Sequence, residues 1–254
     1  MPRTHWPPTN VVKIRRILGC VVVSGLGGFN VPLAAQPMRQ AEISLSVVSD
    51  YRLRGISWSS EKPTIVAGVG VPIGTKNLVH ATSFLPRQDA RAGGANIAFR
   101  FGGRHNEFIG PLRVDAGASC RVFAASDGRS FCELEAGGSF DLATATIYAE
   151  MAYAYKQSAI GGDNLYLGGG ASLSIPQRPV TFSAHAGRSV GKITNPQAAA
   201  RLRPFGDYWD YGAAVTLTNG RLSLIGRYIG TSSSAVQISH QSTGRLVAEA
   251  RLDL

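Results

Sequence analysis

Period-two alternation of apolar and polar residues is the sequence feature that most limits how this chain can fold. In residues 208–219, YWDYGAAVTLTN, the odd positions from Trp209 to Leu217 are apolar, and the intervening positions are polar or small. Successive side chains of a β-strand point to opposite faces. The pattern therefore predicts a strand with one apolar face and one polar face.

Residues 244–254, GRLVAEARLDL, repeat this pattern with charges. The even positions from Leu246 to Leu254 are apolar, and the other side carries Arg245, Glu249, Arg251 and Asp253. An unpaired charge in an apolar medium is very costly, so the two faces of such a strand cannot both be dry. We expect one face to meet apolar surroundings and the other to meet water or counter-charges.

Similar segments recur along the chain and predict an all-β fold of about twelve strands, with ten as the alternative. The alternation of apolar and polar residues is found in the first expected strand, with Ile43, Leu45 and Val47 on one face, as well as in the last. The expected strands cover residues 42–50, 63–71, 77–85, 92–101, 111–124, 130–140, 143–155, 164–175, 179–188, 207–218, 221–230 and 244–254.

The connections between these segments alternate in length. Those after the even-numbered strands are short, as at 72–76 and at Asn219-Gly220, whereas the others tend to be longer, as at 189–206 and 230–243. The exception is 102–110, a long even-numbered connection. Short turns at one rim and long loops at the other are typical of transmembrane β-barrels, which must close because lipid cannot hydrogen-bond a free sheet edge. We therefore expect one antiparallel transmembrane barrel over residues 36–254.

The N-terminal residues have the features of a secretory signal peptide. Lys13, Arg15 and Arg16 precede the apolar residues 17–29, and PLAAQ at 32–36 offers a small-residue cleavage site after Ala35. The apolar stretch is too short to span a membrane as a helix. A lipoprotein signal ending at Cys20 is the less favoured alternative, because that cysteine opens the apolar stretch instead of following it.

The basic charge of the chain is partly explained by this leader. The formal net charge is +10, from 26 basic and 16 acidic residues, and residues 1–35 contain four of the basic residues and no acid. The remaining 22 basic and 16 acidic residues give +6. Because no basic cluster resembles a nucleic-acid-binding motif, we expect no nucleic-acid partner.

Residues 49–60, SDYRLRGISWSS, resemble the signature hairpin of the TorF family of bacterial outer-membrane proteins, which are described as porins of uncharacterised function. Two departures are Leu53, where that family usually has Phe, and Trp58, where it often has Gln. Residues 163–189 and 206–232 resemble other strand pairs of the family. The resemblance implies an outer-membrane location and a pore, with membrane lipid, the barrel-insertion machinery and small solutes as partners, but it implies no particular solute.

Charged residues on the polar faces of the strands are candidates for the pore lining or its rim. If the apolar faces point outward, these side chains either pair to fill a narrow interior or form a ring that selects solutes. The candidates are Asp50, Arg52, Arg54, Arg100, Arg113, Asp115, Arg121, Glu133, Glu135, Glu150, Arg227, Glu249 and Arg251.

The signature stretch itself predicts a structural clamp at the outer rim. Alternation continued from the first strand places Asp50, Arg52 and Arg54 together on the inward face. Neighbouring arginines repel one another unless carboxylates compensate their charges, so we expect acidic partners such as Glu61 or Asp89. A glycine follows at position 55 and allows the chain to turn there.

Cys120 and Cys132 lie symmetrically about a predicted hairpin loop and have the same parity. Both side chains should therefore point to one face of the hairpin. In an oxidising compartment this arrangement predicts a cross-strand disulfide near the outer rim.

Sequence motifs for metalloproteases and nucleotide binding are lacking. The chain has no HExxH pair or phosphate-binding loop, and we expect neither a metal nor another cofactor. One possible catalytic set is His185 with Ser183 on the same face and Glu150 from another strand. The favoured prediction is a porin that forms a narrow, polar-lined channel and is not an enzyme. The alternative is an outer-membrane hydrolase, or a barrel that binds or adheres through its loops.

Overall fold

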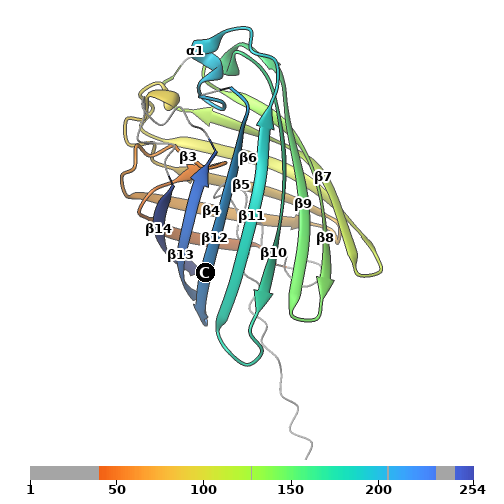
Figure 1. Ribbon diagram of the computed structural model, residues 1–254. Coiled ribbons are helices and arrows are strands. Elements are labelled where there is room, and N and C mark those ends of the chain that lie inside the picture. The colour runs from red at the N-terminus through yellow and green to blue at the C-terminus, as the bar shows by residue number, and fades with distance from the viewer. Residues whose placement is uncertain (1–39, 127, 205, 233–243) are drawn as a thin grey trace, which may run out of the picture.

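Twelve antiparallel strands close into one barrel in the computed structural model, which describes residues 40–126, 128–204, 206–232 and 244–254 (Figure 1). The predicted signal peptide lies outside these residues. The barrel strands are β1 (Glu42–Val48), β4 (Thr64–Ile73), β5 (Asn77–Phe84), β6 (Ala98–Ile109), β7 (Leu112–Phe123), β8 (Phe131–Leu142), β9 (Ala145–Gln157), β10 (Gly162–Ser174), β11 (Val180–Val190), β12 (Tyr208–Asn219), β13 (Leu222–Thr231) and β14 (Arg245–Asp253).

The first and last barrel strands complete the ring. β1 pairs with β14 from Ser44↔Asp253 to Val48↔Glu249 and pairs with β4 on its other side. Every barrel strand thus has a hydrogen-bonded neighbour on both sides. The predicted all-β fold, its closure and its twelve strands are confirmed.

Side chains alternate between the two faces of the wall as the sequence predicts. Along β12, Tyr208 and Asp210 point inward and are buried, while Trp209 and Tyr211, which alternate with them, point outward and are exposed. The polar positions of the strands therefore line the inside of the barrel, and the apolar positions form its outer surface.

The two rims differ in the length of their connections. We call the rim with short turns the turn rim and the opposite one the loop rim. The long loop 232–244 lies largely outside the described residues, and the connection between β9 and β10 at 158–161 is shorter than predicted. The turn rim has the connections 74–76, 110–111, 143–144, 175–179 and 220–221; the loop rim also has 49–63, 85–97, 124–130 and 191–207.

One predicted strand was misplaced. The sequence suggested a strand at 92–101 and a long connection at 102–110, but β6 covers Ala98–Ile109 and only Gly110 and Pro111 form the turn. Gly102 lies inside this strand, and glycine is needed there because a Cβ would come within 2.4 Å of the Ala118 carbonyl oxygen on β7. With this correction, all the connections at the turn rim are short.

A short hairpin enters the mouth of the barrel at the loop rim. It consists of β2 (Arg52–Leu53) and β3 (Ile56–Ser57), with Arg54 and Gly55 at its turn. The backbone nitrogen of Trp58 donates to the carbonyl oxygen of Tyr51 at 2.7 Å and extends the pairing. The hairpin is a sheet separate from the wall, so the first strand ends at Val48 and not at the predicted residue 50.

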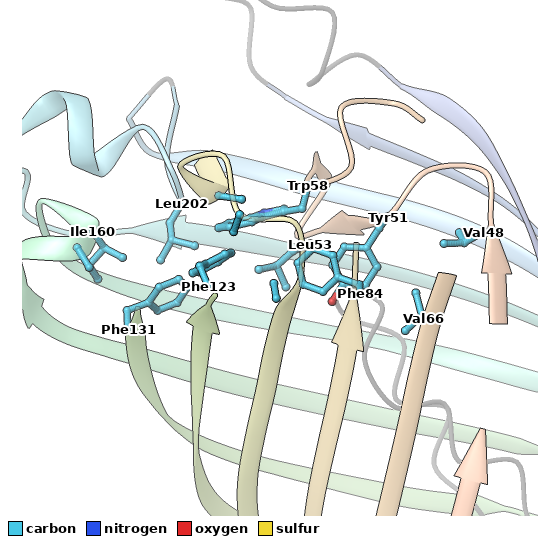
Figure 2. Close-up of a cluster of buried hydrophobic side chains, with 14 of the residues drawn as sticks. Val48, Tyr51, Leu53, Trp58, Val66, Phe84, Phe123, Phe131, Ile160 and Leu202 are labelled. Atoms are coloured by element: carbon cyan, nitrogen blue, oxygen red, sulfur yellow. The ribbon is translucent and has the colours of Figure 1, made fainter. Parts of the chain in front are cut away.

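Aromatic side chains pack around this hairpin and form a core inside the mouth (Figure 2). Trp58 stacks on Phe123 with ring centroids 5.5 Å apart, and Tyr51 stacks on Phe84 at 4.1 Å. Leu202 from the long loop between β11 and β12 also belongs to this cluster. The cluster therefore joins the hairpin, the barrel wall and a distant loop.

Among the described residues of the loop rim are three short helical segments: η1 (Ala90–Ala92), η2 (Ser158–Ile160) and α1 (Pro196–Ala199). The Asn195 side chain accepts hydrogen bonds from Gln197 and Ala198 and caps α1, a favourable use of Asn at a helix N-terminus. In the described part of the chain, no helix is long and apolar enough to cross a membrane.

Replacing Trp58 by alanine should remove the centre of the mouth core. Deleting a buried tryptophan commonly costs about 3–5 kcal/mol of stability, because the lost burial is accompanied by a cavity. We expect Trp58→Ala to lower the temperature at which the compact band of the folded protein disappears on a gel. Trp209→Ala is the matched control, since that ring is on the outer surface. Equal shifts in both variants would contradict the assignment of Trp58 to a core.

Candidate functional site

The inner face of β6, β7 and β8 carries a network of ion pairs. Arg100 Nη2 lies 2.6 Å from Glu135 Oε1, and Ser119 Oγ donates to the same oxygen at 2.7 Å. Arg104 bridges Asp115 at 3.2 Å and Glu135 at 3.3 Å. Three of the predicted lining residues, Arg100, Asp115 and Glu135, thus form one paired patch with Arg104, which was not predicted.

Arg54, at the turn of the hairpin, joins this wall from inside the lumen. Its Nη2 lies 2.8 Å from Glu133 Oε1, and the other oxygen of Glu133 contacts Arg121. The Arg54 guanidinium also lies over the ring of Tyr166 on β10, 4.5 Å from its centroid. Tyr208 Oη on β12 donates to the Arg54 carbonyl oxygen at 3.0 Å. A single residue of the hairpin therefore contacts three strands of the wall.

The conformation of Arg54 is held by these contacts. Its φ of 50° is in the left-handed region, which costs about 1 kcal/mol for a residue with a side chain. Although burial alone lowers the pKa of the Arg54 guanidinium, the Glu133 carboxylate outweighs it, and the pKa lies above its ordinary value. The residue therefore stays charged inside the mouth.

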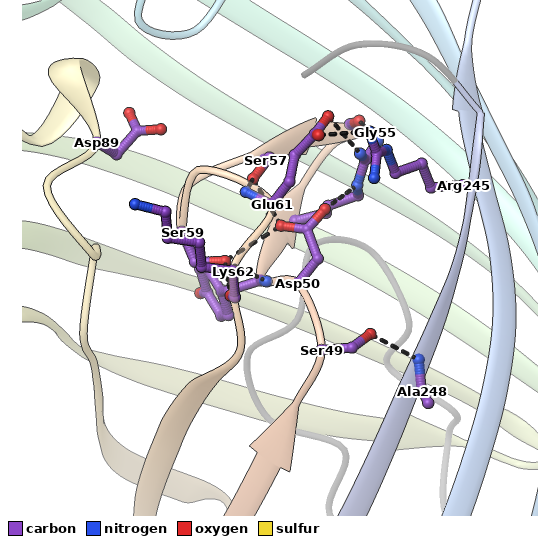
Figure 3. A network of polar contacts seen from close by, with 12 residues as sticks. Ser49, Asp50, Gly55, Ser57, Ser59, Glu61, Lys62, Asp89, Arg245 and Ala248 are labelled. Carbon is purple, nitrogen blue, oxygen red and sulfur yellow. Dashed lines mark hydrogen bonds and ion pairs between the residues drawn. The ribbon is translucent and has the colours of Figure 1, made fainter. Parts of the chain in front are cut away.

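Asp50 organises the base of the hairpin (Figure 3). Its Oδ2 accepts from Arg52 Nε at 2.6 Å, and its Oδ1 accepts from Ser57 Oγ at 2.6 Å. Glu61 lies 3.7 Å from Arg52 Nη2 and also contacts Arg245 on β14. Of the two acids suggested by the sequence, Glu61 lies beside Arg52, whereas Asp89 pairs with Arg91 instead.

A second polar group lies on the inner face of β10, β11 and β12. His185 Nε2 on β11 is 3.1 Å from Asp210 Oδ1 on β12, and Tyr166 Oη donates to the same oxygen at 3.3 Å. The carboxylate beside His185 is thus Asp210, not the Glu150 of the predicted catalytic set. Glu150 lies on the inward face of β9, and Ser183 is on the same face of β11 as His185.

Glycine makes room for Tyr166 on this wall. A Cβ at Gly187 would lie 2.2 Å from Tyr166 Oη, so only glycine allows the ring to lie against β11. Glu150, Gly168, Gly187 and Asp210 follow one another in a cross-strand row. The Tyr166 ring therefore lies beside two glycines, with a carboxylate at each end of the row.

The remaining lining candidates lie near the β1–β14 pairing that closes the barrel, or near the turn rim. Arg227 Nη2 is 2.6 Å from Glu249 Oε2, and Arg251 Nη2 is 2.8 Å from Asp253 Oδ1. Arg113 on β7 is part-buried on the inner face beside Asp115.

Arg201 holds the loops of the mouth together and was not among the predicted residues. Its Nε donates to the carbonyl oxygen of Arg91, and its Nη1 donates to those of Arg129 and Ala159, all at 2.6 Å. The guanidinium also lies 4.9 Å from the centroid of Phe123. Burial lowers the pKa of Arg201 to about 10. The sequence gives no signal for this role, because the three acceptors are backbone atoms of distant loops.

The two cysteines form a disulfide between β7 and β8. They are direct cross-strand partners and alternate with the inward residues Arg121 and Glu133, so their side chains lie on the outward face.

A pocket of about 210 Å³ lies at the loop rim and is lined in part by Arg129, Ser158 and Asn195. Among the side chains that the structure describes, no group of three or more His, Cys, Asp or Glu residues is placed to hold a metal ion.

The comparisons with known proteins agree with the barrel. A family described as "Bacterial protein of unknown function (Gcw_chp)" matches residues 34–252. Among solved structures, the KdgM porin is similar with a TM-score of 0.56 and 6% identity over 83% of this chain and 98% of its own. The NanC porin has a TM-score of 0.57 and 9% identity over 83% and 97%.

A further structure is the KdgM porin in complex with disordered oligogalacturonate, with a TM-score of 0.52 and 5% identity over 84% and 96% of the two chains. No curated protein sequence matches this chain. At such low identity, the structural likeness shows a shared fold and nothing about a shared solute.

Replacing Arg201 by lysine should loosen the loops while keeping the positive charge. One ammonium group cannot reproduce the planar guanidinium contacts to three carbonyl oxygens, and each buried acceptor left unpaired costs about 1–3 kcal/mol. We expect Arg201→Lys to speed protease cleavage within 85–97 and 124–130 in the folded barrel. The control is Arg188→Lys, because Arg188 is exposed on the outer surface. Unchanged cleavage of Arg201→Lys would show that aromatic packing alone fixes the loops.

Proposed function

The chain belongs to the Gcw_chp family of bacterial proteins of unknown function, and we propose that it is a porin of the outer membrane that passes small solutes through a narrow, polar-lined lumen. On this proposal, residues 1–35 direct secretion through the inner membrane. Residues 36–254 are then inserted into the outer membrane by the barrel-insertion machinery. The TorF resemblance of the hairpin supports the same assignment.

The observation that carries the proposal is the separation of apolar and charged residues between the two faces of a closed barrel. Large apolar side chains such as Ile43, Leu45 and Val47 are exposed on the outside, while Arg121, Glu133 and their ion-pair partners are enclosed. Such an extensive apolar surface is unfavourable in water but is suited to lipid. A closed strand ring also leaves no free edge in the bilayer.

The fold shared with the KdgM and NanC porins supports a channel. One of those structures contains oligogalacturonate, but identities below a tenth carry no solute over to this chain. We assign the inward charges as residues that line the pore or its rim. Because most of them are paired within the wall, they favour a narrow passage over a wide aqueous channel.

The hairpin affects the expected conductance. Arg54 and the mouth core occupy the loop end of the lumen. We therefore propose that the resting barrel conducts weakly and that the hairpin limits the current.

The test of this function is conductance across a planar lipid bilayer. Purified protein that is refolded in detergent should give discrete channel events, and removal of the hairpin contacts in Trp58→Ala should increase their amplitude. A barrel that is folded but electrically silent in both forms would argue against a porin. If it instead hydrolysed lipid or peptide esters and lost that activity in His185→Ala, the hydrolase alternative would be favoured.

We also propose that the loop rim faces the exterior of the cell, and this orientation can be tested at the two ends of one strand. Ser130 precedes β8 at the loop rim, and Thr144 follows it at the turn rim; both are exposed. Single cysteines introduced as Ser130→Cys and Thr144→Cys should differ on intact cells, where a membrane-impermeant thiol reagent should label only the first. Labelling of the second alone would reverse the orientation. Labelling of both after permeabilisation shows that each site is reactive.

A further inference from the structure

Arg54 meets the barrel wall as a bound ligand would. It is carried by a separate two-stranded sheet, and its contacts to the wall come from residues on β8, β10 and β12. These strands are not neighbours of the hairpin in the sequence. The pocket around the guanidinium is therefore built by the barrel, and the hairpin only supplies its occupant.

The chemistry of this pocket suits a guanidinium group. Glu133 offers a carboxylate oxygen at 2.8 Å, and Tyr166 offers the face of its ring at 4.5 Å. A carboxylate together with an aromatic face is the usual environment in which proteins bind guanidinium. The pocket is enclosed, because the side chains of Arg54 and Glu133 are only 6% and 0% exposed.

Further carboxylates make the surroundings acidic. Asp210 is fully buried beside Tyr166, and Glu150 lies at the other end of the same cross-strand row. Glu133 already contacts Arg121, so part of its charge would stay compensated without Arg54. Removal of Arg54 alone would still leave three acids near an unoccupied aromatic face.

The hairpin satisfies most of its polar groups internally. Asp50 accepts from Arg52, Ser57 and Ser59, and Arg52 Nη1 donates to the Gly55 carbonyl oxygen at 3.0 Å (Figure 3). Apart from the Arg54 contacts and aromatic stacking, the hairpin is attached through Arg91 Nη1, which donates to the Ser57 carbonyl oxygen at 3.1 Å, and through Glu61, which contacts both Arg52 and Arg245. The hairpin can therefore move away from the pocket as a unit without breaking its own hydrogen bonds.

We propose that the Arg54 pocket is a binding site for solutes that carry a guanidinium group, and that Arg54 occupies it as an internal competitor. This inference rests on the proposed porin function for its biological meaning. The site selects a planar organic cation through Glu133 and Tyr166, and the hairpin keeps the path closed until it is displaced.

Chemical rescue of Arg54→Ala tests the site. The variant should lose its compact gel band at a lower temperature than the wild type, and low millimolar guanidinium chloride should raise that temperature again. Because a charge-assisted hydrogen bond and ring contact are available, guanidinium should bind the variant roughly tenfold more tightly than sodium or tetramethylammonium does. The wild-type barrel should show no such protection, since its pocket is filled.

The same variant should conduct more than the wild type in bilayers and should prefer cations. Guanidinium should block this current at concentrations at which tetramethylammonium does not. Arg54→Lys, which keeps a tethered cation, should stay closed and should not respond to guanidinium. Arg54→Gln replaces the alanine variant if the latter does not refold.

Two controls define the pocket. Arg113→Ala removes another inward arginine, on β7, and should gain no protection by guanidinium. Adding Glu133→Gln to Arg54→Ala should abolish the protection, because the carboxylate that pairs with the cation is gone. Equal protection of Arg54→Ala and Arg113→Ala would overturn the proposal, since it would reflect a general salt effect.

The outcomes separate this inference from the porin assignment. The thermal measurement needs no conductance, so protection by guanidinium in an electrically silent barrel would support the site and count against the channel. Conductance that guanidinium neither blocks nor alters, in a variant without thermal protection, would overturn the site and leave the channel intact.

Discussion

Pairing between β1 and β14 is the interaction on which the rest of the structure depends. This pairing closes the ring, so that every barrel strand has a hydrogen-bonded neighbour on both sides. The closed wall separates an outer apolar face from an enclosed inner face. An enclosed charge is stable only beside a partner, because removal from water is costly for each ion. The arginine–carboxylate pairs along β6–β8 and β13–β14 follow from this enclosure.

The mouth of the barrel combines two ways of filling enclosed space. Towards the loop rim, Trp58 and Phe123 pack as an aromatic core, whereas the lumen beside it holds ion pairs such as Arg54–Glu133. The hairpin belongs to both regions, since Trp58 follows its second strand and Arg54 lies at its turn. A displacement of this one turn therefore changes the packing and the charge balance of the lumen together.

The sequence predicted the parts of this structure that depend on local alternation. The strand of residues 208–219 and the facing cysteines follow from parity alone. The long connection at 102–110 was wrong, because these residues continue β6, where Gly102 lets the backbone of β7 approach. The inward turn of the hairpin and the role of Arg201 were not predictable, since both depend on contacts between segments far apart in the chain.

The contacts of Arg201 have a consequence for how the loops can diverge among related barrels. All three of its hydrogen-bond acceptors are backbone carbonyl oxygens, at Arg91, Arg129 and Ala159. Every amino acid provides such an oxygen, so substitutions at these three positions need not disturb the junction, whereas insertions or deletions would move the acceptors. The surface of the mouth can thus acquire new side chains and new binding properties during evolution while one arginine preserves its architecture.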